Sequence, residues 1–154
     1  MANIITTDIK NALRGKAYLS ALALALTIPD ICTEKKGSNA YRAWYSKYFF
    51  YNSVSDLNYS LTDEECYALR CSFLHEMKTD IGEQFILKRK KDKIEYTFRI
   101  TNDNYQYVVQ LSEEEKIINL SISIFANQML RGYEQFLKDN PSFETQFENI
   151  KIDL

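Results

Sequence analysis

The only histidine of the chain, His75, follows Arg70 by five residues in the stretch LTDEECYALRCSFLHE (61–76). A histidine side chain titrates near neutral pH and can take a proton from a ribose hydroxyl or give one to a leaving oxygen. An arginine side chain is permanently charged, and its planar donors can hold a phosphate and stabilise the charge that builds on it. The two residue types together suffice, without a metal ion, to cleave RNA by attack of its own 2′-hydroxyl, which leaves a cyclic phosphate.

The same pair also has a structural interpretation, which the sequence leaves open. Arg70 would then pair with a surface carboxylate, and His75 would donate a hydrogen bond to a backbone carbonyl. Three glutamates, Glu64, Glu65 and Glu76, lie in the same stretch. They could pair with Arg70 or orient His75, but exposed carboxylates would repel RNA.

The stretch that carries the pair is predicted to be a helix with a well-defined start. Thr62 and Glu65 form a T-x-x-E capping box, and Leu61 and Cys66 are placed as the flanking hydrophobic staple. An apolar face continues at steps of three or four residues through Cys66, Leu69, Phe73 and Met77.

The five-residue spacing separates the two candidate residues around such a helix. At roughly 3.6 residues per turn, the side chains of Arg70 and His75 leave the helix about 140° apart and do not share one face. One copy therefore gives an incomplete site, although an arginine is long enough to curl round. Two copies related by a twofold axis would place two arginines and two histidines around one scissile phosphate, so we expect a homodimer.

Other helices are predicted on both sides of this stretch. The first is expected from Thr7 or Asp8 to Ile28, where Pro29 ends it. Its part 17–28 is apolar nearly all round, which is typical of a central core helix. A signal peptide would carry its A-x-A cleavage sites after the apolar run, whereas here they lie inside it. The segment is also too short to span a bilayer.

A second helix is expected to begin at Ser38 or Asn39, after the polar loop 33–39. Aromatic residues recur along it at helical spacing, which favours core packing over a base-stacking platform. They are Tyr41, Trp44, Tyr45 and Tyr48.

From residue 84 the hydrophobic pattern changes to a period of two. The segments 84–90, 93–100 and 105–111 predict three strands of an antiparallel meander that buries one face. A further capping box, Ser112 with Glu115, predicts a long helix from there to about Lys138.

Composition limits the class of protein. A chain of 154 residues with few glycines and prolines fits one domain, 1–154, that is mainly helical. The net charge of −2 excludes a generic polyanion binder, so nucleic-acid contact requires a local basic patch. The strongest patch lies in LKRKKDK (87–93), where a solvated hairpin tip is the alternative to RNA contact. Its candidate RNA-binding residues are Lys88, Arg89, Lys90, Lys91 and Lys93.

The three cysteines, Cys32, Cys66 and Cys71, cannot form a closed set of disulfides. No C-x-x-C motif is present, and a single histidine is too few for a Cys/His zinc site. We therefore expect no metal and no cofactor, and reduced cysteines in a cytoplasmic protein.

The motif Arg70-Cys-Ser-Phe-Leu-His75 on a helix of a small bundle resembles the R-x4–6-H signature of the HEPN superfamily (higher eukaryotes and prokaryotes nucleotide-binding domains). The longer stretch 61–76, with IPDIC (28–32) upstream, is similar to a group of uncharacterised bacterial proteins. The resemblance covers 8–78 and 112–138 in architecture, and 70–75 in motif.

The resemblance implies a mainly α (α+β) fold: an HEPN-like bundle of about four helices, here with a three-stranded antiparallel β-meander (about 84–111) inserted before the last long helix. It further implies a metal-independent endoribonuclease, homodimeric, with Arg70 and His75 catalytic and Ser72 auxiliary. A toxin or phage-defence effector with an antitoxin or other protein partner, and no membrane contact, is the setting it suggests. The alternatives are a non-catalytic HEPN-like nucleotide-binding or protein-interaction module, and a helical domain with no site at all.

Overall fold

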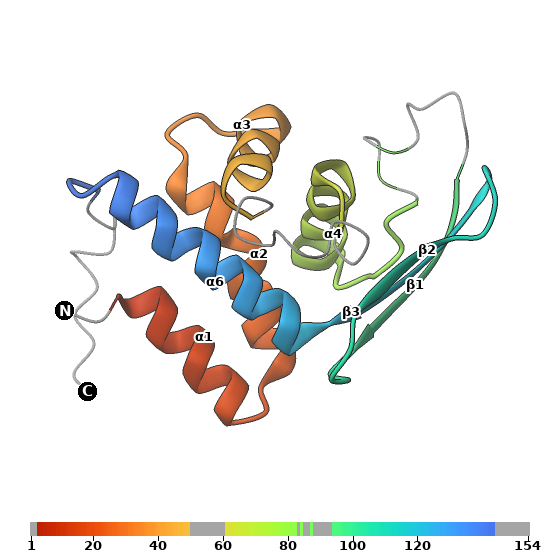
Figure 1. Cartoon of the computed structure of the whole chain (residues 1–154), viewed down its shortest axis with the longest axis horizontal. Coiled ribbons are helices and arrows are strands. Elements are labelled where there is room, and N and C mark those ends of the chain that lie inside the picture. The colour runs from red at the N-terminus through yellow and green to blue at the C-terminus, as the bar shows by residue number, and fades with distance from the viewer. Residues whose placement is uncertain (1–2, 50–60, 83, 85–86, 88–93, 144–154) are drawn as a thin grey trace.

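A computed structural model of the chain describes residues 3–49, 61–82, 84, 87 and 94–143 and shows an α+β fold. Its described part contains five α-helices: α1 (Ile4–Arg14), α2 (Tyr18–Cys32), α3 (Ser38–Trp44), α4 (Asp63–Glu76) and α6 (Ile122–Asp139). A π-helical turn, Tyr45–Phe49, continues α3, and three strands precede α6: β1 (Glu95–Thr101), β2 (Tyr107–Gln110) and β3 (Glu115–Ser121). The helices gather on one side, the sheet projects from them, and α4 lies between the two (Figure 1).

The expected first helix is in fact two helices. Asn3 caps α1 by accepting a hydrogen bond from the backbone N–H of Ile5, so α1 begins before Thr7. The chain then breaks at Gly15 and Lys16, where Lys16 adopts a positive φ of 60° that no helix contains. The sequence prediction of one helix was wrong because the helical pattern continues on both sides of this short break.

Pro29 does not end α2, which runs on to Cys32. A proline inside a helix removes one backbone hydrogen bond. Here the last turn still forms, with Ile28, Pro29 and Cys32 all buried in the core. The prediction that the apolar segment 17–28 is a central core helix is confirmed, because α2 packs against α1, α3, α4 and α6.

The aromatic residues of α3 and the π-helical turn are core residues. Tyr41 and Tyr45 are fully buried, and their hydroxyls donate to the backbone carbonyls of Leu26 (2.9 Å) and Leu61 (2.8 Å). Trp44 and Tyr48 are buried as well, so the core-packing prediction is confirmed for all four aromatic residues. The π-helical turn lies against α6 at Gly132, where an added Cβ would meet the Tyr48 carbonyl oxygen at 3.0 Å.

The predicted capping box of α4 is confirmed. The Thr62 hydroxyl accepts from the backbone N–H of Glu65 (3.1 Å), and the Glu65 carboxylate accepts from the backbone N–H of Thr62 (3.0 Å). The apolar face is confirmed at its buried members, Cys66, Leu69 and Phe73. Met77 was wrongly placed on it: this residue follows the helix with a positive φ of 53° and is 66% exposed.

The sheet is mixed rather than an antiparallel meander. Strand β3 lies in the middle, parallel to β1 and antiparallel to β2. The predicted strands 93–100 and 105–111 correspond to β1 and β2, whereas most of the predicted strand 84–90 lies outside the described residues.

The segment 115–121 is a strand, so the helix predicted from Ser112 and Glu115 begins later, at Ile122. The Ser112 hydroxyl accepts from the backbone N–H of Glu114, and Ser121 caps α6 instead. A short apolar run such as KIINL fits either a helix or a buried strand by its pattern alone. The strand forms because it pairs on both edges, and its residues Ile118 and Leu120 are buried.

Candidate functional site

The structure brings the two candidate catalytic residues into contact within one chain. Nη1 of Arg70 lies 3.1 Å from Nε2 of His75, although their backbone positions leave α4 about 140° apart. The two side chains leave the helix on different faces, as the spacing predicts, and the long arginine side chain curls round to reach the last turn of the helix. His75 is exposed, while the Arg70 side chain is 22% exposed.

The contact fixes which ring nitrogen of His75 accepts. A guanidinium carries only donors, so Nε2 must accept the hydrogen bond from Arg70 and the ring proton resides on Nδ1. In this arrangement the accepting nitrogen of the ring points at Arg70. If a phosphate drew the guanidinium away, Nε2 of His75 would lose this hydrogen bond and lie next to the phosphate.

A third residue, Asp30, holds Arg70 from the other side. Its Oδ2 accepts a hydrogen bond from Nε of Arg70 at 2.9 Å, and this contact joins α2 to α4. Asp30 follows Pro29 in the last turn of α2, where it is the one charged residue of an otherwise uncharged helix. Sequence reasoning missed it because the two partners lie forty positions apart. The IPDIC stretch was noted only for the resemblance.

The surroundings keep Arg70 charged. Partial burial lowers the pKa of Arg70, but the hydrogen bond and negative charge of Asp30 outweigh it, and the net effect is a raised pKa. Asp30 accepts from Nε of the guanidinium, and Nη1 makes the contact with His75. The arrangement is a hydrogen-bonded chain of carboxylate, guanidinium and imidazole, which we call the Asp30–Arg70–His75 chain.

Two neighbours complete this part of the surface. The partly exposed Cys71 lies close to both Arg70 and Tyr67. Burial, followed by the influence of Cys71, raises the pKa of Tyr67. The Tyr67 ring packs edge-on against the buried Tyr41, at 5.3 Å between centroids. The candidate site therefore packs directly against the aromatic core.

Ser72, the predicted auxiliary residue, is not brought together with this pair. Its side chain is 1% exposed, and its hydroxyl donates to the backbone carbonyl of Asp80 (3.0 Å) and accepts from Gln84 (3.1 Å). It leaves α4 about 160° away from Arg70. In the structure Ser72 fastens the segment that follows α4.

The acidic residues of α4 do not pair with Arg70. Glu64 pairs with Arg42, Glu65 with Lys116, and Glu76 with Lys78. Their negative charges are therefore each opposed by a nearby cation. The predicted RNA-binding residues, Lys88, Arg89, Lys90, Lys91 and Lys93, all lie outside the described residues.

Comparisons of the chain with models of protein families, with curated proteins and with solved structures find no match. Over the described ranges, His, Cys, Asp and Glu side chains nowhere gather in threes that could hold a metal ion. No helix in the same part of the chain has the length and apolar character needed to cross a membrane.

Proposed function

We propose that the chain is a metal-independent endoribonuclease of HEPN type in which Arg70 and His75 are the catalytic residues. The observation that carries the proposal is the Asp30–Arg70–His75 chain at the surface. In it, Arg70 is an oriented, charged group that can bind a phosphate, and it contacts His75, a solvent-accessible base.

The chemistry begins when an RNA phosphate binds the Nη donors of Arg70. The guanidinium then leaves Nε2 of His75, which takes the proton of the neighbouring 2′-hydroxyl. The 2′-oxygen forms a bond to phosphorus, the bond from phosphorus to the 5′-oxygen breaks, and a 2′,3′-cyclic phosphate remains. Arg70 stabilises the charge that builds on the non-bridging oxygens.

The leaving 5′-oxygen also needs a proton, and it departs on the side of phosphorus opposite the attacking 2′-oxygen. The histidine that took the proton of the 2′-hydroxyl lies on the wrong side to deliver one there. A homodimer resolves this requirement, because a second copy of His75 across a twofold axis, with its ring protonated, would donate the proton to the 5′-oxygen. Leu74, partly buried on α4, and Met77, 66% exposed just after it, offer apolar surface beside the pair that a second copy would cover.

The experiment that tests the proposal is RNA cleavage in the presence of a chelator. His75→Ala and Arg70→Ala should each lower the rate about 100-fold or more, the usual cost of removing a general base or a charge-stabilising donor. Arg14→Ala, at an exposed position in the last turn of α1, is the matched control and should leave the rate unchanged. Activity that survives both site substitutions would refute the assignment.

The second candidate is a non-catalytic HEPN-like module that binds a nucleotide or a protein partner. The observation in its favour is that Asp30 neutralises much of the charge that Arg70 would offer a transition state. This candidate predicts that Arg70→Ala weakens binding of a nucleotide or RNA while no cleavage product forms with any variant.

The biological setting rests on the resemblance alone. A cytoplasmic toxin or phage-defence effector, restrained by an antitoxin or another protein, is the role we assign to such a ribonuclease. Growth arrest on expression of the wild-type chain, relieved by His75→Ala, is the expected result.

A further inference from the structure

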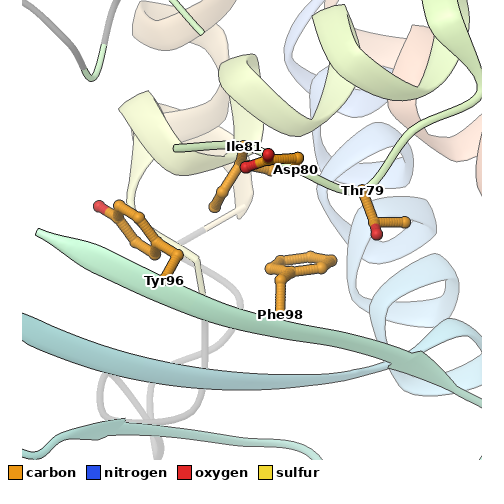
Figure 2. A pocket seen from close by; sticks show the side chains of 5 residues that line it. All are labelled: Thr79, Asp80, Ile81, Tyr96 and Phe98. Atoms are coloured by element: carbon orange, nitrogen blue, oxygen red, sulfur yellow. The ribbon is translucent and has the colours of Figure 1, made fainter. Parts of the chain in front are cut away.

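A cavity of about 250 Å³ lies between the segment that follows α4 and the first strand of the sheet. Thr79, Asp80 and Ile81 line it from one side, and Tyr96 and Phe98 project into it from β1 (Figure 2). A volume of this size holds several water molecules, each of about 30 Å³ in the liquid, and so admits a group the size of a side-chain head.

Among the described residues that line the cavity, Asp80 is the charged one. Its carboxylate makes no ion pair or hydrogen bond with any of the described residues, and the residue is exposed. The nearby Lys78 pairs instead with Glu76 at 2.9 Å. An open carboxylate beside a cavity attracts positive charge and repels phosphate.

The carboxylate and an aromatic ring are close to the same point in space. A Cβ added to Gly82 would lie 3.7 Å from Oδ1 of Asp80 and 3.5 Å from Cδ2 of Tyr96. A cation bound between Asp80 and Tyr96 gains both the charge of the carboxylate and the attraction of an aromatic ring. Quaternary ammonium and guanidinium groups are recognised by this combination.

The walls are held in place from behind. The Glu65 carboxylate, 2% exposed, pairs with Lys116 at 2.6 Å, and its charge adds to the effect of burial in raising the pKa of the nearby Tyr96. On the opposite wall, the Ser72 hydroxyl donates to the backbone carbonyl of Asp80 at 3.0 Å. A cation would therefore enter a largely preformed site, at little cost in ordering the protein.

We propose that this cavity binds an organic cation, an alkylammonium or guanidinium group, between the carboxylate of Asp80 and the rings of Tyr96 and Phe98. The group is either part of a small molecule or the head of a lysine or arginine side chain of a protein partner. The site is independent of the Asp30–Arg70–His75 chain and of the ribonuclease proposal.

The test is a titration of the full chain followed by the NMR signals of Thr79, Asp80, Ile81 and Phe98. Choline is the probe, and 3,3-dimethylbutan-1-ol, of the same shape but without the charge, is its matched control. Choline should shift these four signals and bind more tightly than the alcohol by about threefold or more, the range of a cation–π contact with added charge. Sodium chloride at equal concentration controls for ionic strength.

Two variants locate the site. Asp80→Asn and Phe98→Leu should each weaken choline binding by about twofold to fivefold. Asp8→Asn, on the exposed face of α1, should bind choline like wild type. Asp80 is exposed, so its substitution leaves the core intact. The melting temperature shows whether Phe98→Leu is folded.

The source of the cation is decided by two further arms. Spermidine represents the small-molecule source, and the N-acetyl amides of arginine and lysine represent a partner's side chain. Tighter binding by either set supports the proposal and names the source. Equal binding of choline and the neutral alcohol, an unchanged affinity of Asp80→Asn, or no shift at these four residues would overturn it.

Discussion

At the scale of single residues, Arg70 is restrained at both ends of its guanidinium. Nε of Arg70 donates a hydrogen bond to Asp30, and Nη1 donates one to His75. The orientation of Arg70 is therefore set by two different parts of the chain. Asp30 touches neither phosphate nor hydroxyl in the proposed reaction, and is a positioning residue. Its effect should therefore be seen in how well Arg70 works rather than in whether the chain folds.

We predict a graded loss of RNA cleavage at Asp30. Asp30→Asn keeps an oxygen that accepts from Nε and should lower kcat only severalfold, while Asp30→Ala frees the guanidinium and should lower it about tenfold or more. The measurement is kcat and KM for both variants, with Asp8→Asn as control. Equal effects of the two substitutions, or a change in KM alone, would contradict a role in orienting Arg70.

The candidate site was predictable from the sequence only in part. Arg70 and His75 were found because the histidine is unique and lies on a helix whose capping box is a strong local signal. Asp30 could not be found this way, since a contact between residues so far apart in sequence depends on how α2 packs against α4. Ser72 was misjudged for the opposite reason: nearness in sequence does not place two side chains on one side of a helix.

At the scale of elements, Glu65 joins α4 to the sheet. It completes the capping box of α4, and its Oε2 accepts from Lys116 of β3 at 2.6 Å. The side chains of Glu65 and Lys116 are only 2% and 13% exposed, so the pair is largely buried. Removing one partner of such a pair leaves an uncompensated charge in a poorly solvated place.

We predict that Lys116→Met lowers the free energy of unfolding by about 3 kcal/mol, the usual cost of stranding a buried charge. Adding Glu65→Gln should recover part of the loss because no buried charge remains. Urea unfolding of both single variants and the double variant measures this coupling. Lys78→Met breaks an exposed pair and should change stability by less than about 0.5 kcal/mol. Additive losses in the double variant would contradict the prediction.

The close approach of α6 to the π-helical turn gives a second prediction at this scale. Gly132→Ala adds a Cβ at 3.0 Å from the Tyr48 carbonyl oxygen and 3.1 Å from its carbonyl carbon. A helix gains about 1 kcal/mol when alanine replaces glycine, but backbone atoms cannot yield as a flexible side chain would. We expect a net loss of about 1–2 kcal/mol in urea unfolding.

The matched control for Gly132→Ala is Asn127→Ala, at an exposed position of the same helix. It should stabilise α6 slightly through helix propensity, by a few tenths of a kcal/mol at most, since it also removes a hydrogen bond to Ser123. Stabilisation by Gly132→Ala would show that the helix can move away from Tyr48, against the packing described.

The elements show why patterns predict some parts of a fold and not others. The region of α4 was predicted with its start and its buried side, because capping and periodicity are local properties. The strand β3 was taken for the start of a helix, because its apolar run is short and its partners lie elsewhere in the chain. The break at Gly15 and Lys16 interrupts the helical pattern too briefly to be seen.

At the scale of the whole molecule, several buried groups resist ionisation. Burial raises the pKa of the Cys66 and Cys32 thiols far above their usual value of 9.0, and that of the Tyr41 and Tyr45 hydroxyls well above 10.0. In the unfolded chain these groups lose their protons near the usual values. Above pH 9 the folded state therefore holds more protons than the unfolded state.

The sign of the resulting pH dependence follows directly. Stability falls with rising pH wherever the unfolded state binds fewer protons, so the free energy of unfolding should be flat below pH 9 in this respect and fall above it. Each fully deprotonated group adds a slope of about 1.4 kcal/mol per pH unit. Urea unfolding at a series of alkaline pH values measures the slope.

The role of the Cys66 thiol in this loss is tested with Cys66→Ala, which removes the titrating group without adding a polar one. Cys66→Ser is less suitable because it buries a hydroxyl. The alanine variant should be less stable than wild type at neutral pH and should lose stability less steeply above pH 9. An identical slope in wild type and Cys66→Ala would contradict the assignment of this thiol to the alkaline loss.

The most direct test of the proposed function is a single-turnover cleavage of one RNA and of its 2′-deoxy counterpart, with chelator present. Wild type should cleave the RNA to a 2′,3′-cyclic phosphate and leave the 2′-deoxy strand intact, and His75→Ala should cleave the RNA about 100-fold more slowly or worse. Cleavage of the RNA by His75→Ala at the wild-type rate, or cleavage of the 2′-deoxy strand, would contradict the assignment of Arg70 and His75 as a ribonuclease site.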